Sequence, residues 1–279
     1  MSETNLSEPV ARLVPHGGTE TRPLKGLYLN AELPDQGRAG PWVYTNFVTT
    51  LDGRISLVDP RTGLEGVPET IGDPRDWRLF QELACRADVL IASGRYLRNL
   101  QAGTAQDVLP LGDSPAFADL LAWRHARKLP PQPDVAVVSG SLNFNIPSLF
   151  LDQGRRIIVL TTDNAPSERA SRLEDAGAIV IRVNGGERVS GLGVVRALGA
   201  MGYQRVYAVA GPQVFHTLVD DDVLDTLFLT WRHRIVGGTG STFIAGPTLR
   251  PPTDLAMRWL YQDLASASAG QCFARFDSR

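Results

Sequence analysis

The chain contains few of the residues that mark secreted, metal-binding or membrane-spanning proteins. Only two cysteines, Cys85 and Cys272, and four histidines occur among its 279 residues. Two cysteines cannot make a disulfide framework or a cysteine-rich zinc site, so we expect no metal ion and a cytoplasmic protein. No apolar run approaches the roughly 20 residues that a helix needs to span a bilayer, and the polar start MSETNLSEPV is not a signal peptide.

An excess of positive charge is also missing. The formal net charge is −2, whereas a protein that grips nucleic acid through its phosphates carries a basic excess. The hydrophobic fraction of 43% and the charged fraction of 21% are typical of a globular protein. We therefore expect neither a nucleic-acid nor a membrane partner, and a core sufficient for one large α/β domain or two small ones.

Strand and helix patterns alternate from Pro41 onward. Residues 1–40 carry Pro, Gly and polar residues without a period, so we predict a loosely structured N-terminal arm, followed by one domain over residues 41–279. The expected strands are Trp42–Thr50, Asp88–Ala92, Val135–Ser139, Arg156–Thr161, Ala178–Val183, Val206–Ala210 and Asp225–Trp231, with Gln271–Phe276 as a possible further one. The expected helices begin at Asp73-Pro74, Ser114-Pro115, Pro166 and Ser190, and the first buries Trp77, Phe80, Ala84 and Ala87. This alternation predicts an α/β fold of three layers, with a mostly parallel central sheet and helices on both faces.

The most informative segment is Arg205–Val219, where an apolar strand pattern turns through Gly211-Pro212 into a helix pattern. The N–H groups at the start of a helix have no internal partner, and the helix dipole adds positive potential there. Such a turn can therefore hold a phosphate. Many turns of this kind hold nothing, so the turn alone does not decide the function.

Three further polar turns follow predicted strands, at the edge where sheets of this type bind their ligands. Ser93–Arg95 offers a glycine and a guanidinium that fits a phosphate, and Thr161–Asp163 offers two hydroxyls. Leu51–Arg54 places the carboxylate of Asp52 on a tight turn. Each turn has a plainer interpretation, as a helix cap for the first two and as an Asp-Gly backbone turn for the third.

The order of these segments resembles the dihydrofolate reductase superfamily and, within it, the riboflavin-pathway pyrimidine reductases, whose reductase domain is often fused to a zinc deaminase. The matching segments are YTNFVTTLDGRIS (Tyr44–Ser56), RADVLIASG (Arg86–Gly94), RRIIVLTT (Arg155–Thr162), VYAVAGPQVFHTLVDDDVLDTLFLT (Val206–Thr230) and IVGGTG (Ile235–Gly240). Together they cover about residues 41–276, and their order is specific although each motif is short. The deaminase signature, H-x-E with P-C-x-x-C, is absent.

The resemblance implies NADPH as the cofactor and assigns roles to residues. Those expected to hold the cofactor are Ser93, Gly94, Arg95, Thr161, Thr162, Ala210, Gly211, Pro212, Gln213 and Val214. Those expected to contact the substrate are Asn46, Asp52, Arg54 and Asn99. The family reaction adds a hydride to carbon and a proton to the neighbouring heteroatom. Asp52 is the candidate to fix the substrate or relay that proton, provided that burial raises its pKa, whereas Arg54 is expected to anchor the substrate.

The chain departs from the family pattern mainly on the substrate side. The family usually has Glu-Gly-Gly-Pro at the phosphate turn, where this chain has Ala210-Gly211-Pro212 after Val209, and Lys where Arg54 stands. Where the family has a Gly-Thr-Val…Asp stretch, this chain has Gly94–Tyr96 followed by Asn99. We therefore expect an NADPH-dependent reductase resembling 5-amino-6-(5-phosphoribosylamino)uracil reductase of riboflavin biosynthesis. The alternatives are a diverged nucleotide-binding or regulatory protein without catalysis, and a reductase of another pteridine-like heterocycle.

The Asp225–Trp231 strand bears on the oligomeric state. It is apolar on both faces, so it lies either inside the sheet or against a partner. Because relatives of this reductase family usually pair, we expect a homodimer. The basic segment Arg232–Arg234 that follows is either a phosphate anchor or a solvated strand end.

Overall fold

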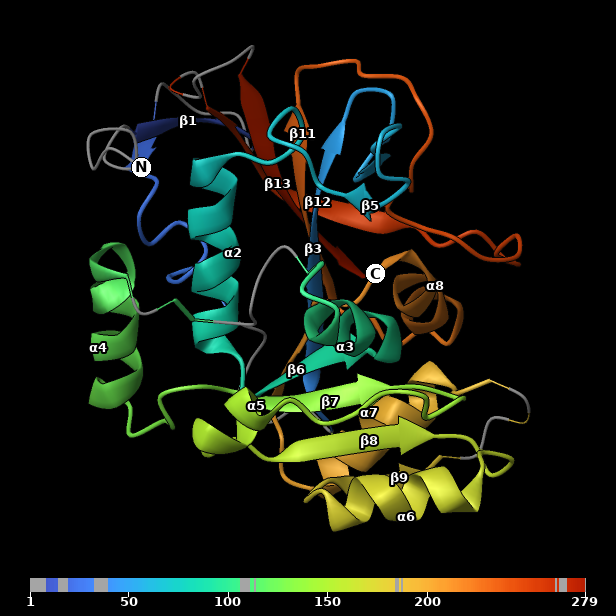
Figure 1. The fold of residues 1–279 in the computed structure, drawn as a ribbon. Helices are drawn as coiled ribbons and strands as arrows, with labels where there is room; N and C mark the ends of the chain where they lie inside the picture. Colours follow the sequence, from blue (N-terminus) through green and yellow to red (C-terminus); the bar gives the residue numbers. More distant parts are fainter. Residues whose placement is uncertain are drawn as a thin grey trace.

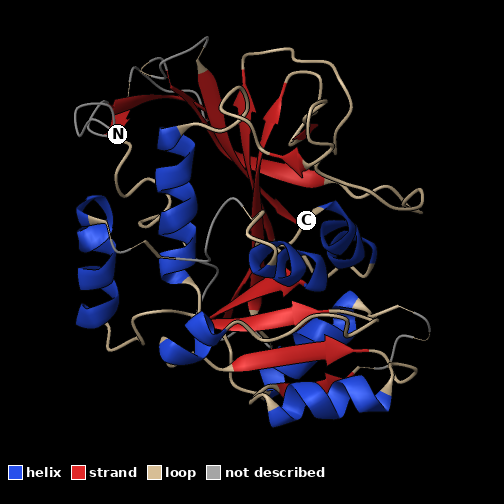
Figure 2. Cartoon of the chain, in the orientation of Figure 1, coloured by secondary structure: helices blue, strands red, loops and turns tan. Residues whose placement is uncertain are grey.

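Helices cover both faces of one large sheet (Figures 1 and 2). The computed structural model describes residues 9–14, 20–32, 40–105, 111–112, 114–183, 186, 188–263, 265 and 270–278. The strands are β1 (Pro9–Val14), β2 (Thr21–Pro23), β3 (Trp42–Thr50), β4 (Leu57–Val58), β5 (Glu65–Gly66), β6 (Val89–Ser93), β7 (Asp134–Val138), β8 (Ile157–Thr161), β9 (Ile179–Arg182), β10 (Arg205–Ala208), β11 (Thr226–Arg232), β12 (Leu255–Asp263) and β13 (Gln271–Ser278). The helices are α2 (Pro74–Arg86), α3 (Gly94–Gln101), α4 (Ala118–Ala126), α5 (Ser148–Asp152), α6 (Ser167–Asp175), α7 (Gly191–Ala200) and α8 (Pro212–Asp220), with a 3₁₀ turn η1 (Pro115–Phe117) before α4.

The main sheet is mixed and mostly parallel, which confirms the predicted fold class. Within the described residues its strand order is β2-β1-β12-β13-β11-β3-β10-β6-β7-β8-β9. From β11 to β9 every neighbouring pair is parallel, and from β2 to β11 every pair is antiparallel. The carboxyl ends of the parallel strands therefore meet along one edge.

The two faces of the sheet carry separate hydrophobic cores. On one face the core is built with residues of α2 to α6, among them Leu83, Leu97, Leu120, Phe150 and Leu173. On the other face it is built with residues of α7 and α8, among them Val194, Leu198, Phe215 and Leu218. This arrangement gives the three predicted layers, because each helix must bury its apolar side against the sheet.

Helix α2 begins where the sequence predicts, but it is buried on more sides than expected. Asp73 is the N-cap and accepts a hydrogen bond from the N–H of Arg75 at 2.8 Å, and Pro74 is the first helical residue. Trp77 and Phe80, expected to be core residues, are only half-buried. The polar residues Arg75, Asp76, Arg78, Gln81, Glu82 and Arg86 are buried instead. Tertiary contacts with α4, with the N-terminal residues and with β11 and β12 cause this difference, and helical periodicity does not report such contacts.

The expectation of a loosely structured arm is wrong for the part of residues 1–40 that the structure describes. β1 pairs with β12 and adds to the sheet, and Leu24 and Tyr28 are buried in the core. Residues 1–8, 15–19 and 33–39 lie outside the described residues. These strands and turns are stabilised by tertiary contacts, so they lack the periodic pattern on which the prediction depended.

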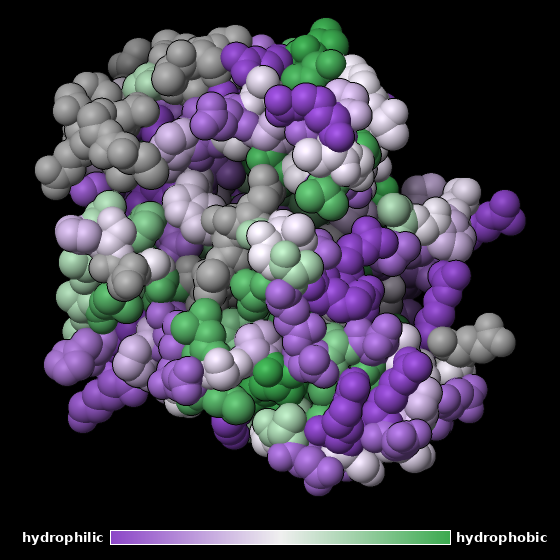
Figure 3. All heavy atoms as spheres, viewed as in Figure 1, coloured by the Kyte–Doolittle hydropathy of each residue, from purple (hydrophilic) through white to green (hydrophobic). Residues whose placement is uncertain are grey.

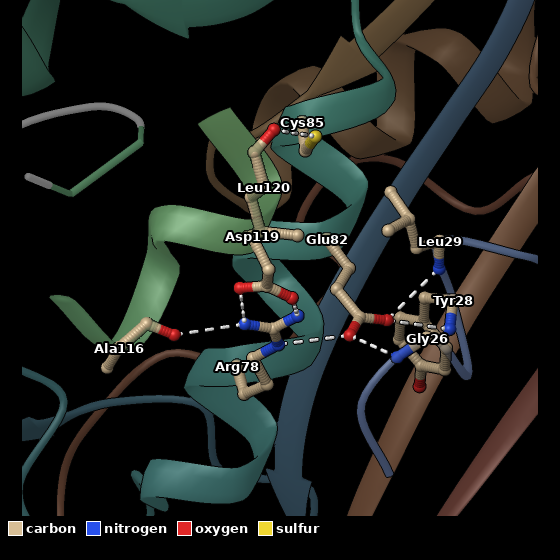
Figure 4. Close-up of polar contacts among 9 residues, drawn as sticks. All are labelled: Gly26, Tyr28, Leu29, Arg78, Glu82, Cys85, Ala116, Asp119 and Leu120. Carbon is tan, nitrogen blue, oxygen red and sulfur yellow. Dashed lines mark hydrogen bonds and ion pairs between the residues drawn. The ribbon is translucent and has the colours of Figure 1, made fainter. Parts of the chain in front are cut away.

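One carboxylate of α2 holds the N-terminal turn in place (Figure 4). Glu82 accepts hydrogen bonds from three backbone N–H groups of Gly26–Leu29, at 2.6, 2.9 and 3.0 Å. Arg78 pairs with Glu82 at 3.0 Å and makes a two-point contact with Asp119 of α4. Burial raises the pKa of Glu82, and the N–H groups and Arg78 oppose that rise. The N-terminal turn, α2 and α4 therefore form one connected unit.

The strand that suggested a dimer is explained within the monomer. β11 pairs with β3 on one side and with β13 on the other, and Leu227, Phe228 and Leu229 are buried on both faces. Its apolar character therefore requires no partner subunit.

Candidate functional site

The predicted site residues follow strands whose carboxyl ends are neighbours in the sheet. β10 lies between β3 and β6, with Ala208 aligned with Thr45 on one side and Ile91 on the other. β7 and β8 come next to β6. The turns after β3, β6, β8 and β10 therefore meet at one edge, where sheets of this kind bind ligands.

The Gly211 turn leaves the start of α8 open. Gly211 is the N-cap, is exposed, and has no described atom within 4 Å of the position that a Cβ would take. Pro212 begins the nine-residue helix, and no side chain among the described residues caps it. Ala210 is buried, Val214 is half-buried and Gln213 is exposed. Backbone N–H groups at an open helix start can donate hydrogen bonds to a phosphate.

Ser93 and Gly94 have structural roles, whereas Arg95 is free to reach a ligand. Ser93 caps α3 and accepts a hydrogen bond from the N–H of Tyr96 at 3.3 Å. A Cβ on Gly94 would lie 3.0 Å from the Ser139 hydroxyl oxygen, so glycine is needed there for packing. Arg95 is exposed near Glu65 of β5. The pKa of Glu65 is lowered mainly by hydrogen bonds from Ser241 and Ser56, and in part by the charge of Arg95.

The threonine turn after β8 contains an unpaired buried hydroxyl. Thr161 is fully buried, and its Oγ1 has no hydrogen-bond partner among the described residues. Thr162 is also buried. Arg182, at the end of β9, donates to the carbonyl oxygens of Thr162, Asp163 and Ala165 and so fixes the turn. The sequence did not single out Arg182, because its partners are backbone groups 17–20 positions away.

Arginines also gather around the loop that follows β7. Arg98 of α3 and Arg169 and Arg172 of α6 donate to carbonyl oxygens of residues 141–144. In the space-filling view, hydrophilic side chains gather over α3 and toward the carboxyl ends of β7 and β8 (Figure 3). The guanidinium groups of these three arginines favour an anionic ligand at this edge of the sheet.

Asp52 lacks the raised pKa that the proposed proton relay requires. It is exposed and accepts hydrogen bonds from the Thr50 hydroxyl at 2.6 Å and from the N–H groups of Gly237 and Val236 at 2.8 and 3.2 Å. These bonds, the one from Thr50 first, lower its pKa to about 2. The expectation that burial would raise this pKa is wrong, because the turn lies on the surface and its donors stabilise the charged form. Asp52 ties the turn after β3 to the glycine-rich loop after β11.

Arg54 reinforces the same connection. Its Nη1 donates to the carbonyl oxygen of Gly240 at 2.8 Å, and its backbone N–H donates to the Thr50 hydroxyl at 3.0 Å. Its Nε is buried without a hydrogen-bond partner among the described residues. Arg54 is therefore half-buried in the loop and keeps one donor for a further contact.

Asn46 lies beside an aromatic surface that sequence reasoning assigned to the core. The Asn46 amide oxygen accepts a hydrogen bond from the hydroxyl of Tyr207, and Asn46 is half-buried. The Tyr207 ring lies 5.7 Å from the Phe80 ring, which stacks on Trp77 at 4.8 Å. A half-buried aromatic surface next to an amide suits a flat, polar heterocycle.

Two predicted residues lie apart from this surface. Asn99 is exposed near the end of α3, where its carbonyl oxygen accepts hydrogen bonds from the backbone of Thr104 and Ala105. Arg232, weighed as a phosphate anchor or a solvated strand end, is neither, since it is buried and paired with Asp73. Arg234 donates to the carbonyl oxygen of Thr70 at 3.2 Å.

The described residues offer neither a metal site nor a membrane-spanning helix. No three or more His, Cys, Asp or Glu side chains come together there in a way that could hold a metal ion. Across the same residues, no helix is both long and apolar enough to cross a membrane.

Comparisons with known proteins agree with the resemblance noted in the sequence. The family model described as the RibD C-terminal domain matches residues 41–263. A pyrimidine reductase-like protein from Corynebacterium diphtheriae is 19% identical with a TM-score of 0.64, over 86% of this chain and 92% of that one. The riboflavin biosynthesis reductase Rib7 of Saccharomyces cerevisiae is 13% identical with a TM-score of 0.57, over 92% of this chain and 97% of that one. At these identities the structural likeness shows the fold alone, and a sequence search of curated proteins gives no match.

A third similar structure is matched over only part of its length. The deaminase/5-amino-6-(5-phosphoribosylamino)uracil reductase of Thermotoga maritima is 15% identical with a TM-score of 0.55, over 86% of this chain but only 57% of that one.

Proposed function

Since the chain belongs to the RibD C-terminal domain family, we propose that it is a reductase that uses NADPH to reduce a phosphoribosylamino-pyrimidine or a related flat heterocycle. One observation carries this proposal. The open helix start at Gly211 follows β10, and the half-buried Asn46 lies on the neighbouring strand β3, bonded to Tyr207 of β10. A phosphate-binding turn and a heterocycle-binding surface thus belong to adjacent strands.

The residues at this edge fit a dinucleotide. The backbone N–H groups at the start of α8 suit the pyrophosphate, and the exposed guanidinium of Arg95 suits the 2′-phosphate. The unpaired hydroxyl of Thr161 is available to a phosphate or ribose oxygen. Bound NADPH supplies the hydride, and the protein orients the two reactants.

On the substrate side, Asn46 presents its amide to the edge of the heterocycle, and Trp77 and Phe80 pack against its face. Asp52 and Arg54 shape the rim, where the ionised carboxylate and the guanidinium anchor polar groups of the substrate. Anchoring in this manner orients a substrate without proton transfer from either residue.

The decisive test is oxidation of NADPH by the purified chain in the presence of the deaminated phosphoribosylamino-pyrimidine. We expect the NADPH absorbance to fall only when the pyrimidine is present. Binding of NADPH without its oxidation, by this pyrimidine or by pteridine-like heterocycles, would instead favour a nucleotide-binding protein without catalysis.

Gly211 provides a matched pair of variants for the cofactor half of the proposal. Its φ of −70° is open to any residue and the Cβ position is empty, so Gly211→Ala is expected to bind NADPH as the parent does. Gly211→Asp places a negative charge at the helix start and is expected to weaken NADPH binding. Equal affinities of both variants, measured by calorimetry, would remove α8 from the phosphate site.

A further inference from the structure

A large cavity lies at the opposite end of β11 from the proposed site. Its volume is about 780 Å³, and it is enclosed by the turn within residues 25–32 on one side and by β2, β12 and β13 on the other. Thr226, the first residue of β11, lines the cavity, whereas the last residue, Arg232, is aligned with Thr50 before the Asp52 turn. At about 3.3 Å per residue, the two ends of this strand lie roughly 20 Å apart. The cavity is therefore separate from the site proposed for NADPH and its substrate.

A β-bulge turns an arginine toward this cavity. Arg258 and Trp259 both line it, although consecutive residues of a regular strand point to opposite faces. The register between β12 and β13 shifts between Met257 and Trp259, which leaves Arg258 as the extra residue. Its Nε donates to Asp277 at 2.8 Å, and this carboxylate also pairs with Arg275. Bulges occur often beside ligand sites, where they redirect a side chain, and this one adds a guanidinium to the cavity wall.

The cavity wall has an excess of positive charge. It contains three carboxylates and five cationic side chains, which are Arg12, Arg22, Lys25, Arg258 and Arg275. Arg258 and Arg275 share the carboxylate of Asp277. Arg12 and Arg22 share the carboxylate of Glu20, which lies beside the cavity. Neither Nη group of Arg258 bonds a described residue, and Lys25 has no ion-pair partner among them. Unbonded donors in a concave, positively charged place favour a phosphate.

An aromatic wall adjoins these charges. Trp259 is half-buried, with the ring of Tyr28 packed at 5.6 Å and that of Tyr261 edge-on at 5.3 Å. Tyr261 also lines the cavity, and its hydroxyl bonds no described residue. Burial raises the pKa of Tyr261, and the charges of Arg22 and Arg12 oppose that rise, so both guanidiniums lie near the hydroxyl. A flat ring beside unbonded donors suits a molecule that carries both an aromatic ring and a phosphate.

We propose that this cavity binds an aromatic phosphate the size of a mononucleotide, with its ring against Trp259 and its phosphate bonded by Arg258. The volume lies within the range of about 300–1,000 Å³ that is typical of small-molecule sites. Glu82 of α2 holds the turn that closes the cavity through three backbone N–H groups, so the cavity is preformed (Figure 4). The site is independent of the proposed reductase activity, because it shares no residue with the cofactor turns or the substrate surface.

Calorimetry with adenosine 5′-monophosphate (AMP) and uridine 5′-monophosphate tests the site directly. We expect both nucleotides to bind the parent chain, and Arg258→Gln to weaken both about tenfold or more, since a hydrogen bond between charged groups is lost. The matched control is Arg156→Gln, which should bind as the parent does. Arg156 pairs with Asp134 at 2.9 Å with side-chain exposures of 56% and 15%, against 58% and 15% for Arg258 and Asp277.

Further arms separate the ring from the phosphate and this cavity from the cofactor turn. Inorganic phosphate and adenosine should each bind more weakly than AMP, and equal affinities for phosphate and AMP would refute the role of the ring. Gly211→Asp should bind AMP as the parent does. Failure of both nucleotides to bind the parent would overturn the inference. Binding that is lost in Gly211→Asp and kept in Arg258→Gln would also overturn it, by placing AMP at the proposed cofactor turn, and would leave the proposed function standing.

Trp259 provides an independent signal. AMP stacked on this ring should quench part of the intrinsic fluorescence in the parent and in Trp123→Phe, a control on α4. Trp259→Phe keeps a flat ring for binding, but its fluorescence should lose this quenching. Quenching that persists unchanged in Trp259→Phe would show that the nucleotide binds elsewhere and would contradict the inference.

Discussion

Arg232 at the end of β11 and Asp73 at the start of α2 form a buried ion pair, with side-chain exposures of 3% and 4%. The two residues are 159 positions apart in the chain. Gln271 of β13 bonds both, accepting from Arg232 at 3.1 Å and donating to Asp73 at 3.2 Å. The pair therefore fixes the helix that carries Asp76, Trp77 and Phe80 against the end of the sheet.

Breaking this pair is expected to destabilise the fold. Arg232→Met leaves the carboxylate of Asp73 buried without its cation, which typically costs about 3–5 kcal/mol. Urea denaturation should report this loss in the free energy of unfolding. The control is Arg61→Met, which removes an exposed pair with Asp59 and should change the stability by less than about 1 kcal/mol. Similar losses in both variants would contradict the structural role given to Arg232.

Asp76 should make the stability depend on pH in the opposite sense to an ordinary carboxylate. Because its folded pKa, about 6, lies above the ordinary value of 3.8, its neutral form stabilises the fold below about pH 4. This contribution is lost as the pH rises through about 6. A shift of about two pKa units corresponds to about 3 kcal/mol. The free energy of unfolding of Asp76→Asn, relative to that of the parent, should therefore rise by roughly that much between pH 4 and pH 7. Parallel stability curves for the two proteins would show that the folded pKa is not raised.

Asp52 should behave in the opposite way. Its folded pKa of about 2 lies below the ordinary value of 3.8, so its contribution to stability is present above the unfolded pKa and is lost as the pH falls through about 2. Asp52→Asn should therefore be less stable than the parent above about pH 4, and the difference should shrink as the pH falls toward 2. A stability difference that does not change with pH would show that the folded pKa of Asp52 is not lowered.

Arg95 should discriminate between the two nicotinamide cofactors. A hydrogen bond to a charged group is worth about 1.5–3 kcal/mol, so Arg95→Ala should weaken NADPH binding about tenfold or more and leave NADH almost unchanged. Dissociation constants from fluorescence titration measure both effects. Arg196→Ala, exposed on α7 at the opposite face of the sheet, serves as the charge-matched control. Equal weakening of NADPH and NADH by Arg95→Ala would place Arg95 outside the 2′-phosphate site.

The homodimer remains a prediction that rests on the family resemblance, since β11 is central in the sheet. The edge strand β9 leaves one side unpaired within the described sheet and exposes Ile179 by 42%, which makes it a surface on which a partner could add. Sedimentation at micromolar concentration should show twice the monomer mass. A single species at 30.3 kDa, with and without NADPH, would contradict this prediction.

Local features of the chain were sufficient to predict much of the fold. The N-cap at Asp73 and Pro74, the turn at Gly211-Pro212 and the buried β3 follow from short-range sterics and periodicity, and each occurs as expected. β12 was missed, since polar residues interrupt its pattern LAMRWLYQD. The paired β1 was missed because a segment of only six residues carries little periodic signal.

The candidate site also has features that the sequence predicted and features that only the tertiary structure decided. The sequence by itself determined that polar turns follow the parallel strands, because short-range interactions decide where a strand ends. Only the tertiary structure decided which acid holds a proton. Asp52 is bonded by N–H groups of a loop more than 180 positions away, and Asp76 is enclosed by Tyr28, Thr230 and Arg232 from two other segments. A pKa depends on desolvation and on the charges nearby, and the folded chain alone determines which residues those are.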